Sequence, residues 1–251
     1  MIPKIIFQTW KTHDVPEHWK KSPESIRKYM PEWEYVLFSD DDNRRFVEDH
    51  FPYFLSYYDS FQYPIQRADA IRYMWLYING GLYLDLDIEL IGSLDHLFEE
   101  GDIFFTSSCN APSSLTNSIM ASKKGHRLWL EMIEEAMKPT AWYAVTRHLK
   151  VMMSAGPDMV DRVVKRSNHS FVLVPKNLVN PYCLCDREYK KRDALIKPLK
   201  GGSWMEDYEQ EIYRTLYCNQ GVIAVGVILL LILLIVIAVL FFWSDNLKLF
   251  A

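Results

Sequence analysis

The feature that most constrains this chain is an apolar block near its end. Val222 to Trp243 form a run of 22 residues without a charged side chain. As a helix that rises about 1.5 Å per residue, the block would be roughly 33 Å long, enough to cross a hydrocarbon core of roughly 30 Å. The block therefore predicts one membrane-spanning helix and excludes a freely soluble protein, and the ordinary density of charged residues in the rest of the chain excludes a disordered one.

The residues before this block have the length and composition of one folded domain. All 28 basic and 32 acidic residues lie outside the block, and we find no internal repeat or low-complexity tract. We expect a domain over residues 1–215, a juxtamembrane segment over 216–221, the membrane helix over 222–243 and a short tail over 244–251. An apolar block in this position is typical of tail-anchored single-pass proteins, which predicts a cytosolic domain on an ER or Golgi membrane.

Charge and cysteine usage narrow the class of partner and the compartment. A net charge of −4 without a basic stripe argues against a nucleic-acid partner. Cys109, Cys183, Cys185 and Cys218 have neither C-x-x-C spacing nor a histidine at zinc-finger spacing. We therefore expect free thiols in a reducing compartment. The single N-glycosylation sequon, at Asn168, would matter only if the domain were lumenal.

Hydrophobic periodicity predicts an α/β domain, because short apolar runs alternate with longer amphipathic ones. The expected strands are residues 4–8, 34–38, 82–87, 103–106, 118–121 and 171–174. The expected helices are residues 16–30, a helix capped by Ser39 or Asp40 and running through Val47, and residues 64–79, 127–138, 142–153 and 158–166. A proline in its first turn and a glycine pair after its end mark residues 64–79 most clearly.

Two aspartates follow that glycine pair, at the end of the expected strand 82–87. Because side chains alternate along a strand, Tyr83, Asp85 and Asp87 should point to the same side. Two carboxylates this close need a compensating cation, and their hard oxygens suit Mg²⁺ or Mn²⁺, although a bare D-x-D can also be a solvated turn. On the preceding helix, Asp69 and Arg72 share one face. They could bind sugar hydroxyls and phosphate, or form a surface ion pair.

Four ordered motifs give the chain a resemblance to a known family. The motifs are IIFQTW at 5–10, RADAIRY at 67–73, GGLYLDLD at 80–87 and GSW at 202–204. They resemble the glycosyltransferases with a D-x-D sugar-binding region, which include fungal initiating α-1,6-mannosyltransferases, mannosyl-inositolphosphorylceramide synthases and bacterial capsular-polysaccharide transferases. The resemblance implies a GT-A-type nucleotide-sugar-binding fold with a mixed central sheet. It also implies retaining, metal-dependent transfer from a nucleotide sugar.

The resemblance implies roles for residues around the aspartate pair. Asp87 would bind the metal ion directly, and Asp85 would contact the ribose or a metal-bound water. Asp69 and Arg72 would hold the donor sugar, and Tyr83 would line the same pocket.

Other motifs would contact the nucleotide. Gln8, Thr9 and Trp10 would lie at the base, with Trp10 either a stacking surface or a core aromatic residue. Ser203 and Trp204 would close over the diphosphate. Many relatives have histidines just before the GSW segment; this chain has Lys200 instead, which could supply the positive charge.

The acceptor side has weaker signals. Asn117 lies in a stretch that resembles the one carrying an asparagine near the acceptor in the ceramide-lipid mannosyltransferases. His126 and His148 could act as bases, although isolated histidines on amphipathic helices are more often structural.

These expectations converge on a membrane-anchored hexosyltransferase. The expected donor is GDP-mannose or a UDP-hexose, with mannose favoured, and the expected acceptor is a lipid-linked or other glycan, with inositol phosphorylceramide the most attractive. Two alternatives stay open. A metal-dependent phosphohydrolase would need ligands for a second metal about 4 Å away. A non-catalytic tail-anchored adaptor would be favoured had either aspartate of the D-x-D or Arg72 been replaced, and none is.

Overall fold

A computed structural model describes residues 1–108, 114–179, 185, 193–201 and 205–248. The chain divides into two compact units, Met1–Gly201 and Gly202–Ala251. The first unit contains the sheets and the predicted site motifs at 5–10, 67–73 and 80–87. The GSW segment, with Ser203 and Trp204, lies outside the described residues.

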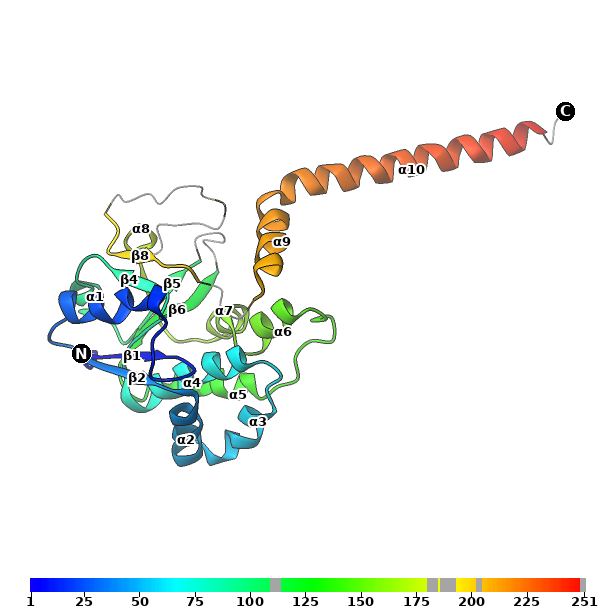
Figure 1. The fold of residues 1–251 in the computed structure, drawn as a ribbon. Coiled ribbons are helices and arrows are strands. Elements are labelled where there is room, and N and C mark those ends of the chain that lie inside the picture. Colours follow the sequence, from blue (N-terminus) through cyan, green and yellow to red (C-terminus); the bar gives the residue numbers. More distant parts are fainter. Residues whose placement is uncertain (109–113, 180–184, 186–192, 202–204, 249–251) are drawn as a thin grey trace. The chain divides into compact units, whose positions relative to one another are not determined.

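A six-stranded mixed sheet with the order β2-β1-β3-β6-β5-β7 forms the centre of the first unit (Figure 1). Its strands are β1 (Ile5–Thr9), β2 (Glu34–Phe38), β3 (Gly81–Leu84), β5 (Ile103–Ser107), β6 (Leu115–Ser122) and β7 (Val172–Val174). β1 is parallel to β2 and β3, β6 is antiparallel to β3 and β5, and β7 is parallel to β5. A second, two-stranded antiparallel sheet pairs β4 (Ile88–Leu90) with β8 (Ile196–Pro198). The α/β fold with a mixed central sheet is therefore confirmed.

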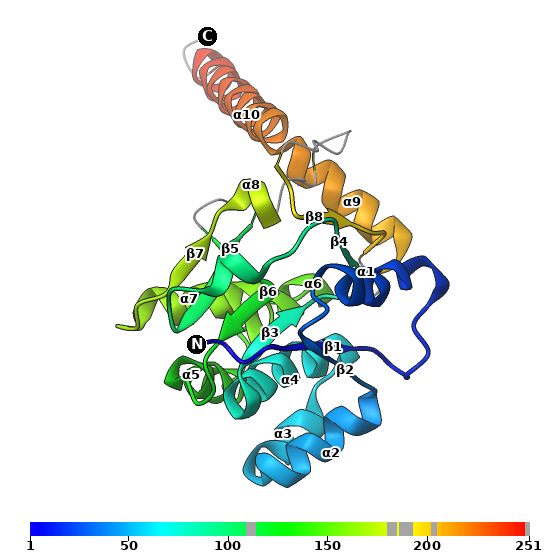
Figure 2. The ribbon, with the colours of Figure 1, turned by 90° about the vertical axis from the view of Figure 1, so that its left-hand side faces the viewer.

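Helices cover both faces of the central sheet, with α1 on the opposite side from α2 and α4 (Figure 2). The α-helices of this unit are α1 (Lys21–Tyr29), α2 (Asp40–His50), α3 (Leu55–Ser60), α4 (Pro64–Asn79), α5 (Arg127–Ala136), α6 (Arg147–Ser154), α7 (Pro157–Arg166) and α8 (Lys176–Val179). Three short 3-10 helices are η1 (Glu17–Trp19), η2 (Pro52–Phe54) and η3 (Asp95–Phe98). Ser39, one of the two predicted caps, accepts a hydrogen bond from the Asp42 N–H and caps α2.

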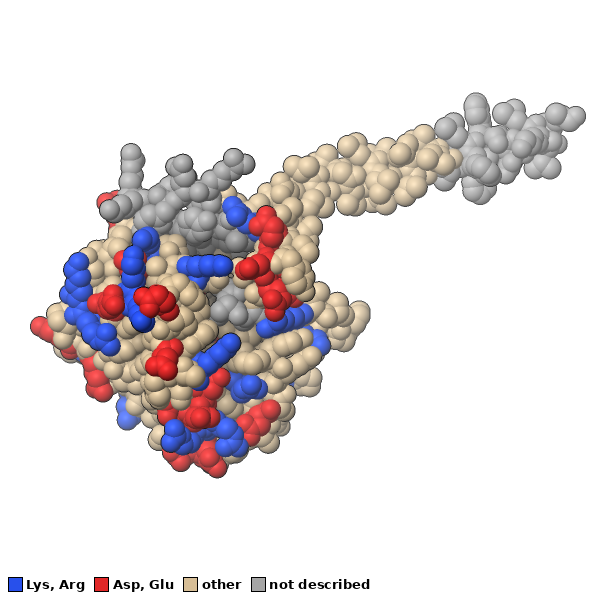
Figure 3. Space-filling view, in the orientation of Figure 1, with Lys and Arg blue, Asp and Glu red and all other residues tan. Residues whose placement is uncertain are grey.

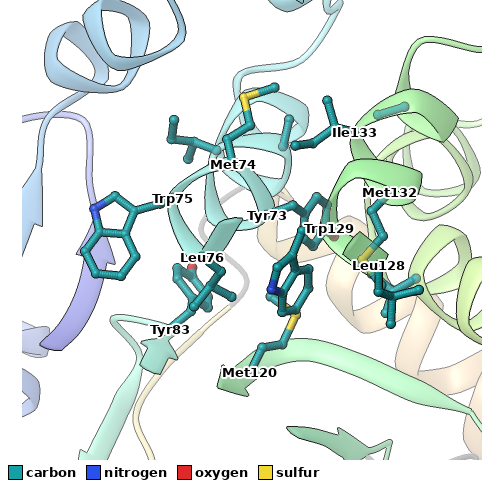
Figure 4. Close-up of a cluster of buried hydrophobic side chains, with 14 of the residues drawn as sticks. Tyr73, Met74, Trp75, Leu76, Tyr83, Met120, Leu128, Trp129, Met132 and Ile133 are labelled. Atoms are coloured by element: carbon teal, nitrogen blue, oxygen red, sulfur yellow. The ribbon is translucent and has the colours of Figure 1, made fainter. Parts of the chain in front are cut away.

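Alternation along the strands divides the apolar side chains between two cores. Tyr83 of β3 packs in the core under α4, α5 and α7, whereas its neighbours Leu82 and Leu84 pack in the core that includes α1 and β4. Figure 4 shows the first core, in which Trp129 of α5 stacks on Tyr73 of α4 with 6.0 Å between ring centroids. The predicted alternation of side chains along β3 is thus observed, and Tyr83 faces α4.

The turn after α4 brings that helix back over β3. The helix ends at Gly80, which has a φ of +71°, and Gly81 has a φ of +93°. Both values lie in the region that favours glycine. A Cβ on Gly81 would lie 2.4 Å from the carbonyl oxygen of Ile5, so this glycine allows β3 to lie close against β1.

Some predicted boundaries are wrong for physical reasons. The strand expected over 82–87 ends at Leu84: the Asp85 N–H still donates to the Ser118 carbonyl at 2.9 Å, and then the chain turns toward β4. The helix expected over 142–153 begins at Arg147, because Thr146 caps it and the preceding residues form a loop. Residues 16–30 form two helices, η1 and α1, rather than one.

The second unit contains α9 (Asp207–Cys218) and α10 (Gln220–Lys248). Within α10, residues 220–237 have a mean hydropathy of 3.1, and none of this window is buried. In the described part of the chain, α10 is the one helix that is long and apolar enough to cross a membrane. The range of α10 includes residues 222–243, where the membrane helix was expected.

The cysteines differ from the prediction. Cys185 and Cys218 are both disulfide-bonded, so the expectation of free thiols is wrong for them, whereas Cys109 and Cys183 lie outside the described residues. Spacing along the sequence did not reveal this, because a disulfide depends on which side chains the fold brings within reach. Disulfides persist in oxidising compartments, so the expected reducing compartment loses its support.

A buried carboxylate joins α5 to α7. The side chain of Glu135 is 7% exposed and accepts hydrogen bonds from Lys138, Arg162 and Arg166 at 2.7, 3.2 and 2.7 Å. Burial alone would raise the pKa of Glu135, but these hydrogen bonds lower it to about 2.

We expect Glu135→Gln to lower the free energy of unfolding at pH 7 by about 1–2 kcal/mol, since its arginine partners are partly solvated. Because the folded pKa is depressed, the stabilisation is present above the ordinary value of 4.5 and is lost as pH falls toward 2. The gap between wild type and variant should narrow over that range in urea unfolding of the full chain in detergent, followed by tryptophan fluorescence. Glu134→Gln, an exposed neighbour, is the control; equal losses in both variants would contradict this role of Glu135.

Candidate active site

The predicted site residues around the D-x-D motif, as far as the structure describes them, gather at one edge of the central sheet. β1, β2 and β3 are parallel, so their carboxyl ends lie at the same edge, where Trp10 and Asp85 follow β1 and β3. Ligands of α/β proteins commonly bind outside the carboxyl ends of parallel strands. α4, which packs over β3, adds Asp69 and Arg72 to this edge.

Arg72 lies at the centre of the site, with its side chain 5% exposed. Its Nη1 donates to Asp85 Oδ1 at 3.1 Å and to the Asn117 carbonyl at 2.8 Å, and its Nη2 lies 3.1 Å from Asp69 Oδ1. The guanidinium carbon is 4.4 Å from the ring centroid of Tyr83. The ion pair between Asp69 and Arg72 is therefore buried, which excludes the surface pair left open above.

Asp69 is fixed from a second side by β6. Asn117 Nδ2 donates to Asp69 Oδ1 at 2.9 Å and to the Tyr73 hydroxyl at 3.0 Å, and that hydroxyl donates to the Ala155 carbonyl at 2.6 Å. Burial raises the pKa of Asp69 to about 7, even though Arg72 acts to lower it. Asn117 is buried and holds Asp69 through this hydrogen bond, and its expected place beside the acceptor stays a prediction.

The two aspartates of the D-x-D motif have different partners. Asp85 Oδ1 accepts a hydrogen bond from the Tyr83 hydroxyl at 2.6 Å in addition to the one from Arg72. Asp87 forms no ion pair with any described residue. Burial and the charge of Asp85 raise the pKa of Asp87 to about 7. Asp87 is thus a mostly enclosed carboxylate without its own cation.

The segment after β8 lies against Asp87. The Leu199 N–H donates to the Asp87 carbonyl at 2.7 Å, and Trp19 Nε1 donates to the Lys200 carbonyl at 2.7 Å. A Cβ on Gly201 would lie 2.1 Å from Asp87 Oδ2, so a larger residue at 201 would displace that carboxylate. The sequence indicated Lys200 as a possible positive charge, but it gave no reason to select Gly201. The contact of Gly201 with Asp87 depends on the pairing of β4 with β8, which the sequence did not predict.

Gln8, expected at the nucleotide base, is fully buried. Its Nε2 donates to Ser22 Oγ at 2.9 Å and to the Asp85 carbonyl at 3.2 Å, while its Oε1 accepts from the Tyr35 hydroxyl at 2.9 Å. These contacts connect β1 to the turn that carries Asp85. Gln8 therefore supports the position of Asp85 from inside the protein.

Thr9 and Trp10 lie nearer the surface. Thr9 Oγ1 donates to the Phe38 carbonyl at 3.2 Å and accepts from Asn43 Nδ2 at 2.6 Å, so its hydroxyl joins β1 to β2 and α2. Trp10 is half-buried and packs edge-on against Trp19, with 4.7 Å between ring centroids. Lys11 Nζ lies over the ring of Trp10, 5.3 Å from its centroid, and a stacking role for Trp10 stays a prediction.

The two histidines considered as bases, His126 and His148, lie at the start of α5 and on α6 and form none of the contacts described above for Asp69, Arg72, Asp85 and Asp87. His126 Nδ1 accepts from the Leu128 N–H at 3.3 Å and caps α5, and its ring lies 5.3 Å from that of His169. His148 lies on α6, where burial lowers its pKa. His126 therefore has the structural role that was favoured for an isolated histidine.

We expect Arg72→Met to lower the free energy of unfolding by about 3–5 kcal/mol, because it leaves the charges of Asp69 and Asp85 buried without their cation. Burial already raises both of their pKa values, so the loss should be smaller at low pH, where the two carboxyls are neutral. Thermal unfolding of the full chain in detergent would measure this. Arg67→Met is the control, because Arg67 also lies on α4 and donates only to the Phe61 carbonyl in the described structure; a comparable loss there would contradict a special role for Arg72.

Comparisons with known proteins agree with these motifs. Residues 16–103 match the family described as "Glycosyltransferase sugar-binding region containing DXD motif". Inositol phosphoceramide mannosyltransferase 3 of Schizosaccharomyces pombe is 34% identical over 215 residues, which cover 81% of this chain and 56% of that protein. Mannosyl phosphorylinositol ceramide synthase SUR1 of Saccharomyces cerevisiae is 34% identical over 211 residues, which cover 82% of this chain and 53% of that protein.

The chain therefore spans about half the length of these relatives. Among solved structures, the PaToxG glycosyltransferase aligns with a TM-score of 0.47 and 19% identity, over 66% of this chain and 69% of that one. The resemblance drawn from the motifs is confirmed: residues 16–103 match the family of glycosyltransferase sugar-binding regions that contain a DXD motif, and the chain is similar to relatives named as inositol phosphoceramide mannosyltransferases.

Proposed function

We propose that this chain is a membrane-anchored glycosyltransferase that moves a hexose, with mannose favoured, from a nucleotide sugar to a lipid acceptor. The observation that carries the proposal is the buried cluster of Asp69, Arg72 and Asp85 beside the unpaired carboxylate of Asp87. Relatives named for mannosyl transfer to inositol phosphoceramide favour that lipid as the acceptor. The donor would be GDP-mannose or a UDP-hexose, and α10 would be the membrane anchor.

We propose that Asp85 and Asp87 hold a divalent cation, Mn²⁺ or Mg²⁺. Three carboxylates, Asp69, Asp85 and Asp87, face the single guanidinium of Arg72, which leaves an excess of negative charge that a divalent cation would balance. In the described part of the chain no three His, Cys, Asp or Glu side chains form a closed metal site. Mg²⁺ and Mn²⁺ commonly bind through one or two carboxylates, with water and substrate phosphates as further ligands. A bound cation would stabilise the negative charge of the departing diphosphate.

The role of Arg72 in this proposal differs from the one first expected. Its guanidinium already contacts two carboxylates and the Asn117 carbonyl, so it has little charge left to neutralise a phosphate. We infer that Arg72 orients Asp69 and Asp85, whose oxygens then accept hydrogen bonds from sugar and ribose hydroxyls. Preorganised groups of this kind lose little entropy when substrate binds.

The transfer is proposed to retain the configuration at the anomeric carbon. The acceptor hydroxyl would approach on the side of the leaving group and form the new carbon–oxygen bond as the carbon–phosphate-oxygen bond breaks. Its proton would pass to the departing phosphate oxygen, so that no side-chain base is required. The capping role of His126 is consistent with this route.

The two alternative functions have no observation in their favour. A phosphohydrolase with two metals would need a further group of acidic or histidine ligands, and the described residues contain no such group. An adaptor without activity would have no need for the buried and costly charge cluster around Arg72, which is complete.

The experiment that tests the transferase proposal measures thermal unfolding of the full chain in detergent with Mn²⁺ and a panel of nucleotide sugars. One donor at about 100 times its Kd should stabilise the chain by about 2.7 kcal/mol, and Asp87→Ala should abolish this effect. Gly201→Ala keeps the charge of Asp87 but displaces its carboxylate, so it should weaken the effect as well. Asp14→Ala, at an exposed position, is the control. Donor stabilisation that survives Asp87→Ala, or indifference to every donor, would overturn the proposal.

We also propose that residues 1–201 lie in the lumen of the ER or Golgi. The support is the disulfide bonding of Cys185 and Cys218, because such bonds persist in oxidising compartments. This replaces the cytosolic placement expected from the position of the apolar block. Asn168 and Ser170 of the sequon are both exposed, in the segment between α7 and β7, as glycosylation of Asn168 would require.

Expression of the full chain in yeast tests the lumenal placement. We expect one N-linked glycan, seen as a mobility shift that a glycosidase reverses and that Ser170→Ala removes. Asn177→Gln, which lies outside any sequon, should leave the shift unchanged. A sequon-bearing extension after Ala251 serves as the opposite reporter: a glycan on that extension, and none on Asn168, would place the domain in the cytosol.

A further inference from the structure

A patch of exposed apolar side chains lies in the loop before α6 and on the first turns of that helix. The patch consists of Trp142, Tyr143, Val145 and Leu149, whose exposed fractions are 90, 54, 76 and 36%. Figure 3 shows uncharged surface at the right-hand edge of the main body, where the loop before α6 lies in Figure 1. Gathering four large apolar side chains on so short a segment is costly in water, and such patches commonly mark a binding surface.

The patch is held in a defined shape. Ala144, between the exposed residues, is 3% exposed and anchors the loop, and its N–H donates to the Ala141 carbonyl at 2.9 Å. The rings of Trp142 and Tyr143 contact each other edge-on with 5.8 Å between centroids. Thr146 Oγ1 accepts from the Leu149 N–H at 3.2 Å and starts α6. The apolar side chains are thus presented outward by a supported loop.

The segment that carries the patch is basic by sequence, in a chain whose net charge is −4. Residues 136–157 contain Lys138, Arg147 and Lys150 and no aspartate or glutamate; Lys138 pairs with Glu135, which leaves Arg147 and Lys150 as the cations of the patch. Arg147 and Lys150 form no ion pair with a described residue, and Arg147 Nε has no hydrogen-bond partner among them. Cations beside exposed aromatic residues are complementary to a surface that has an apolar layer under a layer of negative charge.

The patch is connected to the candidate site through α4. Arg147 lies over the ring of Tyr63, just before α4, at 5.3 Å, and Lys150 Nζ donates to Gln62 Oε1 at 3.2 Å. Toward the end of α6, Ser154 Oγ accepts from Gln66 Nε2 at 2.7 Å. Asp69 follows Gln66 by three residues, about 4.5 Å along the helix axis. The patch and the sugar-binding acid are therefore carried by two helices in direct contact.

We propose that this patch inserts into the headgroup region of an anionic bilayer and brings the site to its lipid acceptor. The inference rests on the proposed function, since it names how a lipid acceptor reaches the site. Tryptophan and tyrosine are the residues that favour the membrane interface. Each lysine or arginine near an anionic leaflet adds about 1 kcal/mol of attraction. The cations Arg147 and Lys150 favour an anionic surface, and α10 supplies a reason for that surface to be a bilayer.

Fluorescence quenching in proteoliposomes tests the contact without relying on transferase activity. The full chain is placed in vesicles of phosphatidylcholine and phosphatidylinositol, with or without bromine on the acyl chains. Vesicle binding alone would be uninformative, because α10 would anchor every variant. The spectrum of wild type minus that of Trp142→Phe isolates the emission of Trp142. We expect this emission to be blue-shifted and quenched by brominated lipid.

The control is the spectrum of wild type minus that of Trp129→Phe, because Trp129 is fully buried in the core and should not be quenched. Emission from Trp142 that is unquenched and has the long wavelength of a ring in water would overturn the proposal. Emission that is blue-shifted but unquenched would mean that a second copy or another protein covers the patch, and it would overturn the proposal equally.

A second measurement tests delivery of the acceptor. Tyr143→Ser should raise the apparent KM for a bilayer-embedded acceptor roughly fivefold, with the KM for the donor unchanged. Tyr53→Ser is the matched control, because Tyr53 and Tyr143 are both 54% exposed. Equal acceptor KM values for wild type and Tyr143→Ser would overturn the role in acceptor access. Should no variant transfer sugar at all, the proposed function fails, and the quenching result still decides whether the patch meets the membrane.

Discussion

The buried guanidinium of Arg72 is the contact on which the site depends. A charge taken out of water costs several kcal/mol unless nearby groups compensate it, and here Asp69, Asp85 and the Asn117 carbonyl do so together. These partners come from α4, from the turn after β3 and from β6. A shift of any of the three elements would separate the charges, so the same contact fixes both the packing of α4 on the sheet and the orientation of the acids.

That arrangement explains why the second aspartate of the motif differs from the first. Arg72 balances Asp85 but does not pair with Asp87, and burial together with the charge of Asp85 raises the pKa of Asp87. The segment carrying Gly201 packs on this carboxylate from a distant part of the sequence. The proposed cation would therefore bind where the fold leaves a negative charge uncompensated, between a fixed turn and a close-packed glycine.

The sequence predicted the elements with strong local signals and missed those that depend on distant contacts. The helix 64–79 and the strand 34–38 were predicted with their observed bounds, because proline, glycine and a clear period delimit them. β4 and β8 are three residues each, too short for a hydrophobic alternation to be recognised, and about a hundred residues of sequence separate them. The D-x-D pair and its neighbours were predicted as a site, but the inward role of Asn117 depends on β6 lying under α4, which no spacing reveals.

The distribution of charge relates the proposed site to the proposed membrane contact. The carboxylates beside Arg72 would repel an acceptor with a phosphate in its headgroup, whereas they would attract the cation that accompanies a nucleotide diphosphate. The acid-free segment 136–157, with Arg147 and Lys150, offers the anionic headgroup a separate place. α4 and α6 would thus hold the diphosphate of the donor and the phosphate headgroup of the acceptor at separate places. Only the sugar and the acceptor hydroxyl would then lie close together. The patch would then have two roles. It would hold the domain at the bilayer, and it would position the acceptor, because the headgroup binds the basic residues while its hydroxyl reaches the donor sugar.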